Sequence, residues 1–188
     1  MRIFLRTERM SLRRFTESDV DKLVELDSDP EVMRYLNDGR PTPRSEVENR
    51  ILPLYFGYYA RYEGFGWWAA IEEASGEFLG WFEFRPHEGD EPGDVELGYR
   101  LRKRFWGKGY ATEGGRALIH RGFTELGVRR VYAQTMAVNR GSRRVLEKCG
   151  LRFVRTFHED WAEPIEGSEH GEVEYALTRA EWARQEKP

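Results

Sequence analysis

The stretch Arg104-Phe105-Trp106-Gly107-Lys108-Gly109-Tyr110-Ala111 lies between a predicted strand, residues 95–101, and a predicted helix that starts near Gly107. Gly107 and Gly109 lack Cβ atoms, so the backbone can adopt positive φ and approach an anion closely. N–H groups at a helix N-terminus point outward together, and the helix dipole favours negative charge there. The stretch therefore predicts a phosphate-binding turn. The alternative is an ordinary helix start beside a surface charge run.

The elements around this turn predict a mixed α/β (α+β) fold. Strands that meander as hairpins, followed by one strand-helix-strand unit, indicate a mostly antiparallel sheet of six to seven strands with helices on both faces. The expected strands are residues 10–15, 66–71, 78–84, 95–101, 131–135, 151–161 and 172–178. The expected helices are residues 20–26, 32–36, 43–62 and 107–126, one that ends at Gly150, and 180–184.

Composition narrows the class of protein. A chain of 188 residues fits a single domain over 1–188, and 39% hydrophobic with 34% charged residues argues against disorder. The single cysteine, Cys149, excludes a disulfide framework, and the four histidines lack metal-ligand spacing, so we expect no metal. The lone cysteine fits a reducing compartment, so we expect a cytoplasmic protein. A net charge of -3 and the absence of a long apolar run predict no nucleic-acid or membrane partner.

Residues 104–113 resemble the acetyl-CoA-binding motif of the GCN5-related N-acetyltransferase family, Arg/Gln-x-x-Gly-x-Gly/Ala. Segments along nearly the whole chain resemble its ribosomal-protein N-acetyltransferase branch, namely residues 7–13, 29–36, 96–99, 139–151 and 175–179. The resemblance implies a sheet splayed into a V at its centre. Acetyl-CoA would lie between the strand that ends near Leu101 and the strand 131–135.

The resemblance also implies which residues bind the cofactor. The backbone of Leu101 would contact the pantetheine arm, Asn139 would hydrogen-bond that arm, and Arg143 would reach the phosphates. The alternative for Asn139 is a helix N-cap, a position where asparagine is common, and both roles are compatible. The pyrophosphate would be held by Arg104, Trp106, Gly107, Lys108, Gly109, Tyr110 and Ala111.

The expected reaction is direct attack of an amine on the thioester, which needs a base and support for the departing thiolate. Glu96 is the candidate base because it lies on the strand that flanks the thioester; Glu83 is second, and a solvated glutamate paired with an arginine is the alternative for Glu96. Many family members place a tyrosine acid where this chain has Leu146. Ser142 is the candidate donor to the thiolate, or else only a helix-cap residue.

The acceptor is not identified by the sequence. An N-terminal α-amine of a protein or a small amine is expected, with the chain as a monomer or homodimer. A non-catalytic acyl-CoA sensor and a nucleotide-triphosphate enzyme are alternatives. Aromatic residues, Trp67 and Trp68 with Tyr58 and Tyr59, either wall the acceptor pocket or, more commonly for such clusters, belong to the core.

Overall fold

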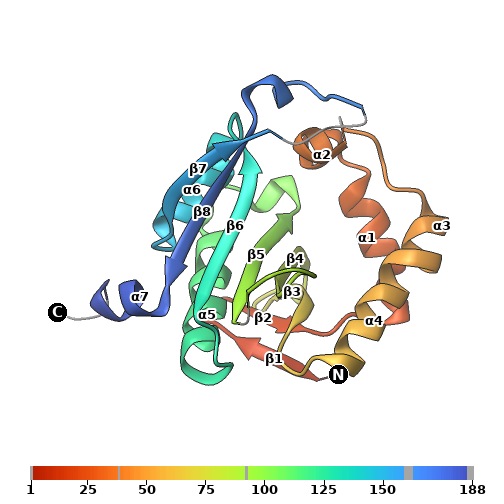
Figure 1. The fold of residues 1–188 in the computed structure, drawn as a ribbon. Coiled ribbons are helices and arrows are strands. Elements are labelled where there is room, and N and C mark those ends of the chain that lie inside the picture. The colour runs from red at the N-terminus through yellow and green to blue at the C-terminus, as the bar shows by residue number, and fades with distance from the viewer. Residues whose placement is uncertain (1, 38, 92, 159–162, 186–188) are drawn as a thin grey trace.

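The computed structural model describes residues 2–37, 39–91, 93–158 and 163–185. In this part of the chain eight strands join one sheet in the order β1-β2-β3-β4-β5-β6-β8-β7 (Figure 1). All neighbours are antiparallel except β5 and β6. The strands are β1 Ile3–Arg6, β2 Met10–Arg13, β3 Gly66–Glu72, β4 Phe78–Arg85, β5 Asp94–Leu101, β6 Arg130–Met136, β7 Arg152–Phe157 and β8 Glu172–Thr178. The predicted fold class is confirmed, and β1 is a strand beyond those expected.

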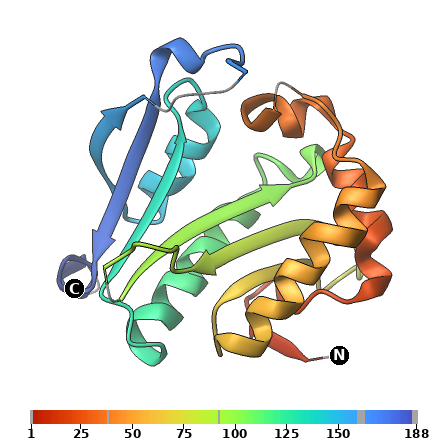
Figure 2. The ribbon, with the colours of Figure 1, turned by 45° about the vertical axis from the view of Figure 1, so that its right-hand side comes forward.

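Helices cover both faces of this sheet, as predicted (Figures 1 and 2). One face carries α1 to α4, and the other carries α5 and α6. Their bounds are α1 Val20–Asp27, α2 Pro30–Asn37, α3 Arg44–Glu46, α4 Leu52–Arg61, α5 Tyr110–Glu125, α6 Arg140–Lys148 and α7 Arg179–Gln185. A π-helical turn, Val47–Ile51, joins α3 to α4. Among the residues described, no helix is both long and apolar enough to cross a membrane.

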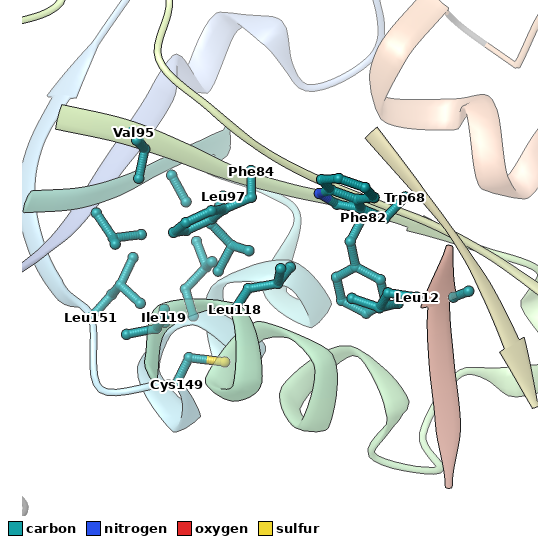
Figure 3. Close-up of a cluster of buried hydrophobic side chains, with 14 of the residues drawn as sticks. Leu12, Trp68, Phe82, Phe84, Val95, Leu97, Leu118, Ile119, Cys149 and Leu151 are labelled. Carbon is teal, nitrogen blue, oxygen red and sulfur yellow. The ribbon is translucent and has the colours of Figure 1, made fainter. Parts of the chain in front are cut away.

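Two hydrophobic cores form because strand side chains alternate between the faces. The larger core lies between the sheet and α5, where Trp68, Phe82 and Leu118 are among its buried members (Figure 3). The smaller core lies under α1 and α4, where Trp67 stacks on Tyr55 with ring centroids 4.4 Å apart. Trp67 and Trp68 are therefore core residues on opposite faces, which favours the core interpretation of the tryptophans over a shared pocket wall.

The sheet opens at its centre. The parallel ladder between β5 and β6 covers only Asp94–Glu96 against residues 130–132. Beyond it, β5 stays paired with β4 up to Leu101, whereas β6 stays paired with β8 up to Met136. The two strands consequently diverge, as Figure 1 shows. Their facing backbone edges are no longer paired with each other, and this splay agrees with the expected V.

Candidate functional site

The glycine turn sits at the upper end of β5, directly before α5. Gly107 has φ of 72° and Gly109 has φ of 88°, so both adopt the left-handed conformation that glycine tolerates best. Gly109 is the N-cap of the 16-residue helix α5 and provides no side-chain cap. A Cβ built on Gly107 would meet no atom within 4 Å. The turn therefore presents bare backbone and open space at a helix N-terminus, which suits an anion.

A side chain from the β1–β2 connection holds this turn in place. The Arg9 guanidinium donates to the Lys108 carbonyl at 2.9 Å and to the Glu113 carboxylate at 2.7 Å. It also lies 4.4 Å from the centre of the Tyr110 ring. Arg9 lies within the segment 7–13 that supported the family resemblance, but sequence reasoning gave it no role. Its partners are about a hundred residues away, so only the fold brings them together.

The basic side chains at the turn have acidic or aromatic neighbours. Arg104 forms an exposed ion pair with Glu77 at 3.2 Å, and its guanidinium lies 4.9 Å from the Phe105 ring centre. The Lys108 ammonium lies 5.5 Å from the same ring. Both side chains are exposed. Exposed pairs of this kind are weak, so an anionic ligand can compete for Arg104.

Three other residues predicted to bind the cofactor, Trp106, Tyr110 and Ala111, contact the end of β5 or neighbouring protein groups. The indole nitrogen of Trp106 donates to the Leu101 carbonyl at 2.7 Å, so that carbonyl already has a partner. The phenol of Tyr110 is buried and donates to Glu72, which leaves its backbone at the first position of α5. Ala111 follows on α5 and is half-buried.

Asn139 and Arg143 shape the start of α6. Asn139 is the N-cap of this helix, and its Oδ1 accepts the Ser142 N–H at 3.1 Å. Arg143 donates from Nε to the Tyr175 hydroxyl at 3.1 Å and from Nη1 to the Ala137 carbonyl at 3.0 Å. The predicted cap role of Asn139 is therefore present. Arg143 points at the β6–α6 loop and β8, so its side chain serves this loop rather than standing open for a phosphate.

Ser142 contacts a tyrosine from β5. The Tyr99 hydroxyl lies 3.0 Å from Ser142 Oγ and 3.2 Å from the Ser142 carbonyl oxygen. Burial raises the pKa of Tyr99, so its phenol stays protonated at neutral pH. Leu146, at the position where many family members have a tyrosine, is buried in the core. Sequence reasoning missed Tyr99, although it belongs to the quoted segment 96–99.

Glu96 lies on the face of β5 opposite Tyr99. It belongs to a cluster of charged side chains together with Glu83 and His87. The imidazole of His87 forms an ion pair with Glu96, and its Nε2 lies 3.6 Å from Glu83. Glu83 also pairs with Arg85 at 2.6 Å. Glu83 and then Glu96 raise the pKa of His87 to about 9. Glu96 is thus paired, but with a histidine instead of the arginine considered in the alternative.

The sequence did not reveal the pairing of His87 with Glu96, because His87 follows β4 and Glu96 lies within β5. The antiparallel register places Arg85 opposite Glu96 and so returns the chain to the same spot. Gly98 leaves room for Glu83, since a Cβ there would come within 3.3 Å of the Glu83 side chain. One imidazole nitrogen of His87 and one carboxylate oxygen each of Glu83 and Glu96 lie within 4.8 Å of one another. The spacing of histidines along the sequence did not indicate this cluster.

Known proteins of similar sequence are acetyltransferases. The family model described as the acetyltransferase (GNAT) domain matches residues 9–152. An FsC-acetyl coenzyme A-N(2)-transacetylase from Aspergillus fumigatus is 37% identical over 190 residues, which cover 98% of this chain and 80% of that protein.

Solved structures show the same fold. A probable acetyltransferase matches with a TM-score of 0.78 at 26% identity, over 93% of this chain and 96% of that chain. RimL, a ribosomal L7/L12 alpha-N-protein acetyltransferase in complex with coenzyme A, matches with a TM-score of 0.78 at 20% identity. The match covers 94% of this chain and 98% of that chain. The family model spans most of this chain, and the chain therefore belongs to the GNAT family of acetyltransferases.

Proposed function

We propose that this chain transfers the acetyl group of acetyl-CoA to a primary amine by direct attack of the amine on the thioester. The observation that carries the proposal is the divergence of β5 from β6 beside the glycine turn. At this divergence Glu96 lies on one face of β5, and the Tyr99–Ser142 pair lies on the other. An acyl group between the strands would have a proton acceptor on its amine side and hydrogen-bond donors on its sulfur side.

The residues of the turn fit a pyrophosphate. Gly107 leaves space where any side chain would begin, and the backbone of Lys108, Gly109 and Tyr110 leads into the α5 N-terminus. Arg104 and Lys108 would supply positive charge. Because pantetheine amides can pair with an open strand edge, the splayed edge of β5 near Leu101 would bind the arm.

The start of α6 would bind the same arm. Asn139 uses its Oδ1 for the cap, and its Nδ2 would donate to the pantetheine. We propose that Arg143 contributes by fixing the loop before α6, because both of its contacts are with the protein. The phosphate role expected for Arg143 is thereby replaced with a positioning role.

Glu96 and His87 would accept the proton that the amine loses. At neutral pH the imidazolium of His87 holds the Glu96 carboxylate, since the pKa of His87 is raised to about 9. As His87 loses its proton, the pair gains the capacity to accept one from the attacking amine. An α-amine, with an ordinary pKa of about 7.7 to 8.0, loses its proton far more readily than a lysine side chain at about 10.4.

The acceptor class follows from this face. Glu83 and Glu96 have cationic partners here, Arg85 and His87, which supports a basic group over an acid on this face. Two of the compared proteins carry names that specify an N(2) amine and an alpha-N protein amine. We therefore propose an α-amine of a peptide or of a small molecule as the acceptor.

A thiol-release assay with acetyl-CoA tests the proposal against a panel of N-terminal peptides, amino acids, polyamines and aminoglycosides. Glu96→Gln should lower kcat by about 10² to 10⁴-fold, because general-base catalysis contributes about that much, and should leave acetyl-CoA affinity nearly unchanged. Glu88→Gln, at an exposed position of the β4–β5 connection, is the matched control.

The outcomes are separable. Thiol release that depends on an amine supports the transferase, and the best acceptor identifies the substrate class. Binding of acetyl-CoA without acceptor-dependent release at any pH tested would leave the sensor alternative. Unaltered turnover of Glu96→Gln would remove Glu96 from the reaction even if the transferase proposal holds.

A further inference from the structure

Tyr99 is a half-buried tyrosine on β5 that contacts Ser142. It projects from β5 toward α6, on the face opposite Glu96, because it shares the face of Val95 and Leu97. Its ring packs 6.1 Å from Phe82, centre to centre. Its hydroxyl lies 3.0 Å from Ser142 Oγ and 3.2 Å from the Ser142 carbonyl oxygen.

We infer that Tyr99 is a positioning residue for the Ser142 hydroxyl, which donates a hydrogen bond to the departing sulfur of CoA. This inference rests on the proposed function and extends it to the leaving group. A hydroxyl carries one hydrogen and can accept two hydrogen bonds. The one hydrogen of Tyr99 can go to the Ser142 carbonyl oxygen at 3.2 Å or to Ser142 Oγ, the nearer acceptor at 3.0 Å. When Tyr99 donates to Oγ, the serine hydrogen is free to point elsewhere, and the splay between β5 and β6 is where sulfur would lie.

The leaving group of the reaction is the CoA thiolate. Attack of the amine nitrogen forms the N–C bond, and collapse of the tetrahedral adduct breaks the C–S bond and leaves the electron pair on sulfur. The Ser142 O–H donates to that thiolate and stabilises its charge. The proton lost by the amine goes to the Glu96–His87 pair and is later exchanged with solvent, while the thiolate takes a proton from solvent after release. Tyr99 keeps its own proton throughout.

The surroundings of Tyr99 suit a fixed donor. Burial raises the pKa of Tyr99, which keeps the phenol from ionising in the working range. Cys149 follows the last residue of α6, and burial raises the pKa of its thiol to about 12. Neither group therefore competes for the negative charge that develops on sulfur. Leu146 offers no hydrogen-bonding group, and Arg143 donates to Tyr175 and Ala137, so Ser142 carries the hydroxyl group of α6.

Titration of CoA bound to the whole protein tests the inference without an amine acceptor. Thiolate ultraviolet absorbance, measured against pH, gives the pKa of the bound thiol. Because a hydrogen bond contributes about 1 kcal/mol, Ser142→Ala should raise this pKa by about 1, and Tyr99→Phe should raise it by a similar or smaller amount. Tyr99→Phe in the Ser142→Ala background should then change nothing further, since Tyr99 acts through Ser142.

Tyr59→Phe is the matched control. It removes a tyrosine hydroxyl that donates to the backbone carbonyl of Trp67, and Tyr59 belongs to α4 and not to β5 or α6. It should lower the thermal midpoint as Tyr99→Phe does but leave the pKa of bound CoA unchanged. An equal pKa in wild type, Tyr99→Phe and Ser142→Ala would overturn the inference, as would additive effects in the double variant.

Turnover gives the second readout once an acceptor is found. Tyr99→Phe should lower kcat by about 3- to 10-fold and leave the KM for acetyl-CoA unchanged, because the hydrogen bond to sulfur forms only as charge develops. Wild-type protein that binds CoA and lacks transfer to any amine would refute the proposed function, whereas normal transfer with an unperturbed Tyr99→Phe would refute this inference alone. A failure to bind CoA would refute both.

Discussion

Gly107→Ala separates the conformational demand of the glycine turn from its role in ligand binding. Gly107 has φ of 72° and open space at its Cβ position, and Gly76, in the β3–β4 turn, has φ of 73° and the same open space. An alanine in this left-handed conformation costs about 1 to 2 kcal/mol of stability. Gly107→Ala and Gly76→Ala should therefore lower the free energy of unfolding by nearly equal amounts.

Their effects on CoA should differ. A methyl group at position 107 would occupy the space that the pyrophosphate needs, and inserting such a group into a close contact costs about 1 to 3 kcal/mol. That cost corresponds to a dissociation constant larger by about 5- to 150-fold. Gly76→Ala should leave the constant unchanged because the β3–β4 turn is outside the site, and Gly107→Val should abolish measurable binding.

Isothermal titration of CoA and urea unfolding of the two alanine variants provide the measurements. Equal losses of stability together with a selective loss of CoA affinity in Gly107→Ala are expected. If both variants bound CoA as well as wild type, the pyrophosphate would not approach Gly107, and the assignment of the whole turn would be wrong. If both lost affinity equally, the effect would come from stability and not from the site.

Three further predictions concern titratable groups. His87→Gln, measured with an α-amine acceptor, should move the rise of kcat/KM from about pH 9 toward about pH 8, the range of the amine itself; an unmoved profile would remove His87 from proton transfer. In wild type the ion pairs of His87 should stabilise the fold fully below pH 6.5 and lose this contribution as the pH rises through about 9, since the folded-state pKa is the higher one. Asp19→Asn should lower the free energy of unfolding by about 3 to 5 kcal/mol, because it leaves the buried Arg13 without its carboxylate partner. Burial alone would raise the pKa of Asp19, but hydrogen bonds from Arg13 and Lys22 outweigh it and lower that pKa, so the contribution is lost as the pH falls below about 4; urea unfolding that is insensitive to Asp19→Asn would contradict this assignment.

The alternation of apolar residues was sufficient to locate seven of the strands. Strand β1 was not predicted. It lies at the edge of the sheet and is only partly buried, so its residues Ile3 to Arg6 show no buried face. The helix expected over 43–62 is present but interrupted by the π-helical turn Val47–Ile51. A one-residue excess in a helical turn leaves the spacing of apolar residues almost unchanged, and sequence patterns do not reveal it. The end expected for the strand 151–161 falls partly on residues 159–162, which are outside the described residues.

The conformation of the glycine turn was predictable because one short segment determines it. Gly107 and Gly109 adopt positive φ, and backbone conformation at a helix start is a local property. Arg9, His87 and Tyr99 are the opposite case, because each acts on a partner from another element. His87 approaches Glu96 only through the antiparallel register of β4 and β5. Tyr99 approaches Ser142 only because α6, which packs on α5 and β6, places its first turn beside β5. Side chains that acquire a role through such tertiary contacts carry no pattern of their own.

The register of β5 explains how one strand can serve both ends of the proposed reaction. If the base and the hydroxyl that donates to the thiolate lay on the same side, they would hydrogen-bond to each other. Neither would then be available to the reaction. Glu96 and Tyr99 are three residues apart, and an odd separation on a strand places two side chains on opposite faces. Because β6 leaves the ladder directly after the pair of Glu96 with Tyr132, both faces are reached from the one opening between the strands. The proton acceptor and the hydroxyl donor are therefore kept apart by the pleat of the strand, and the thioester is the group that would bring them into one reaction.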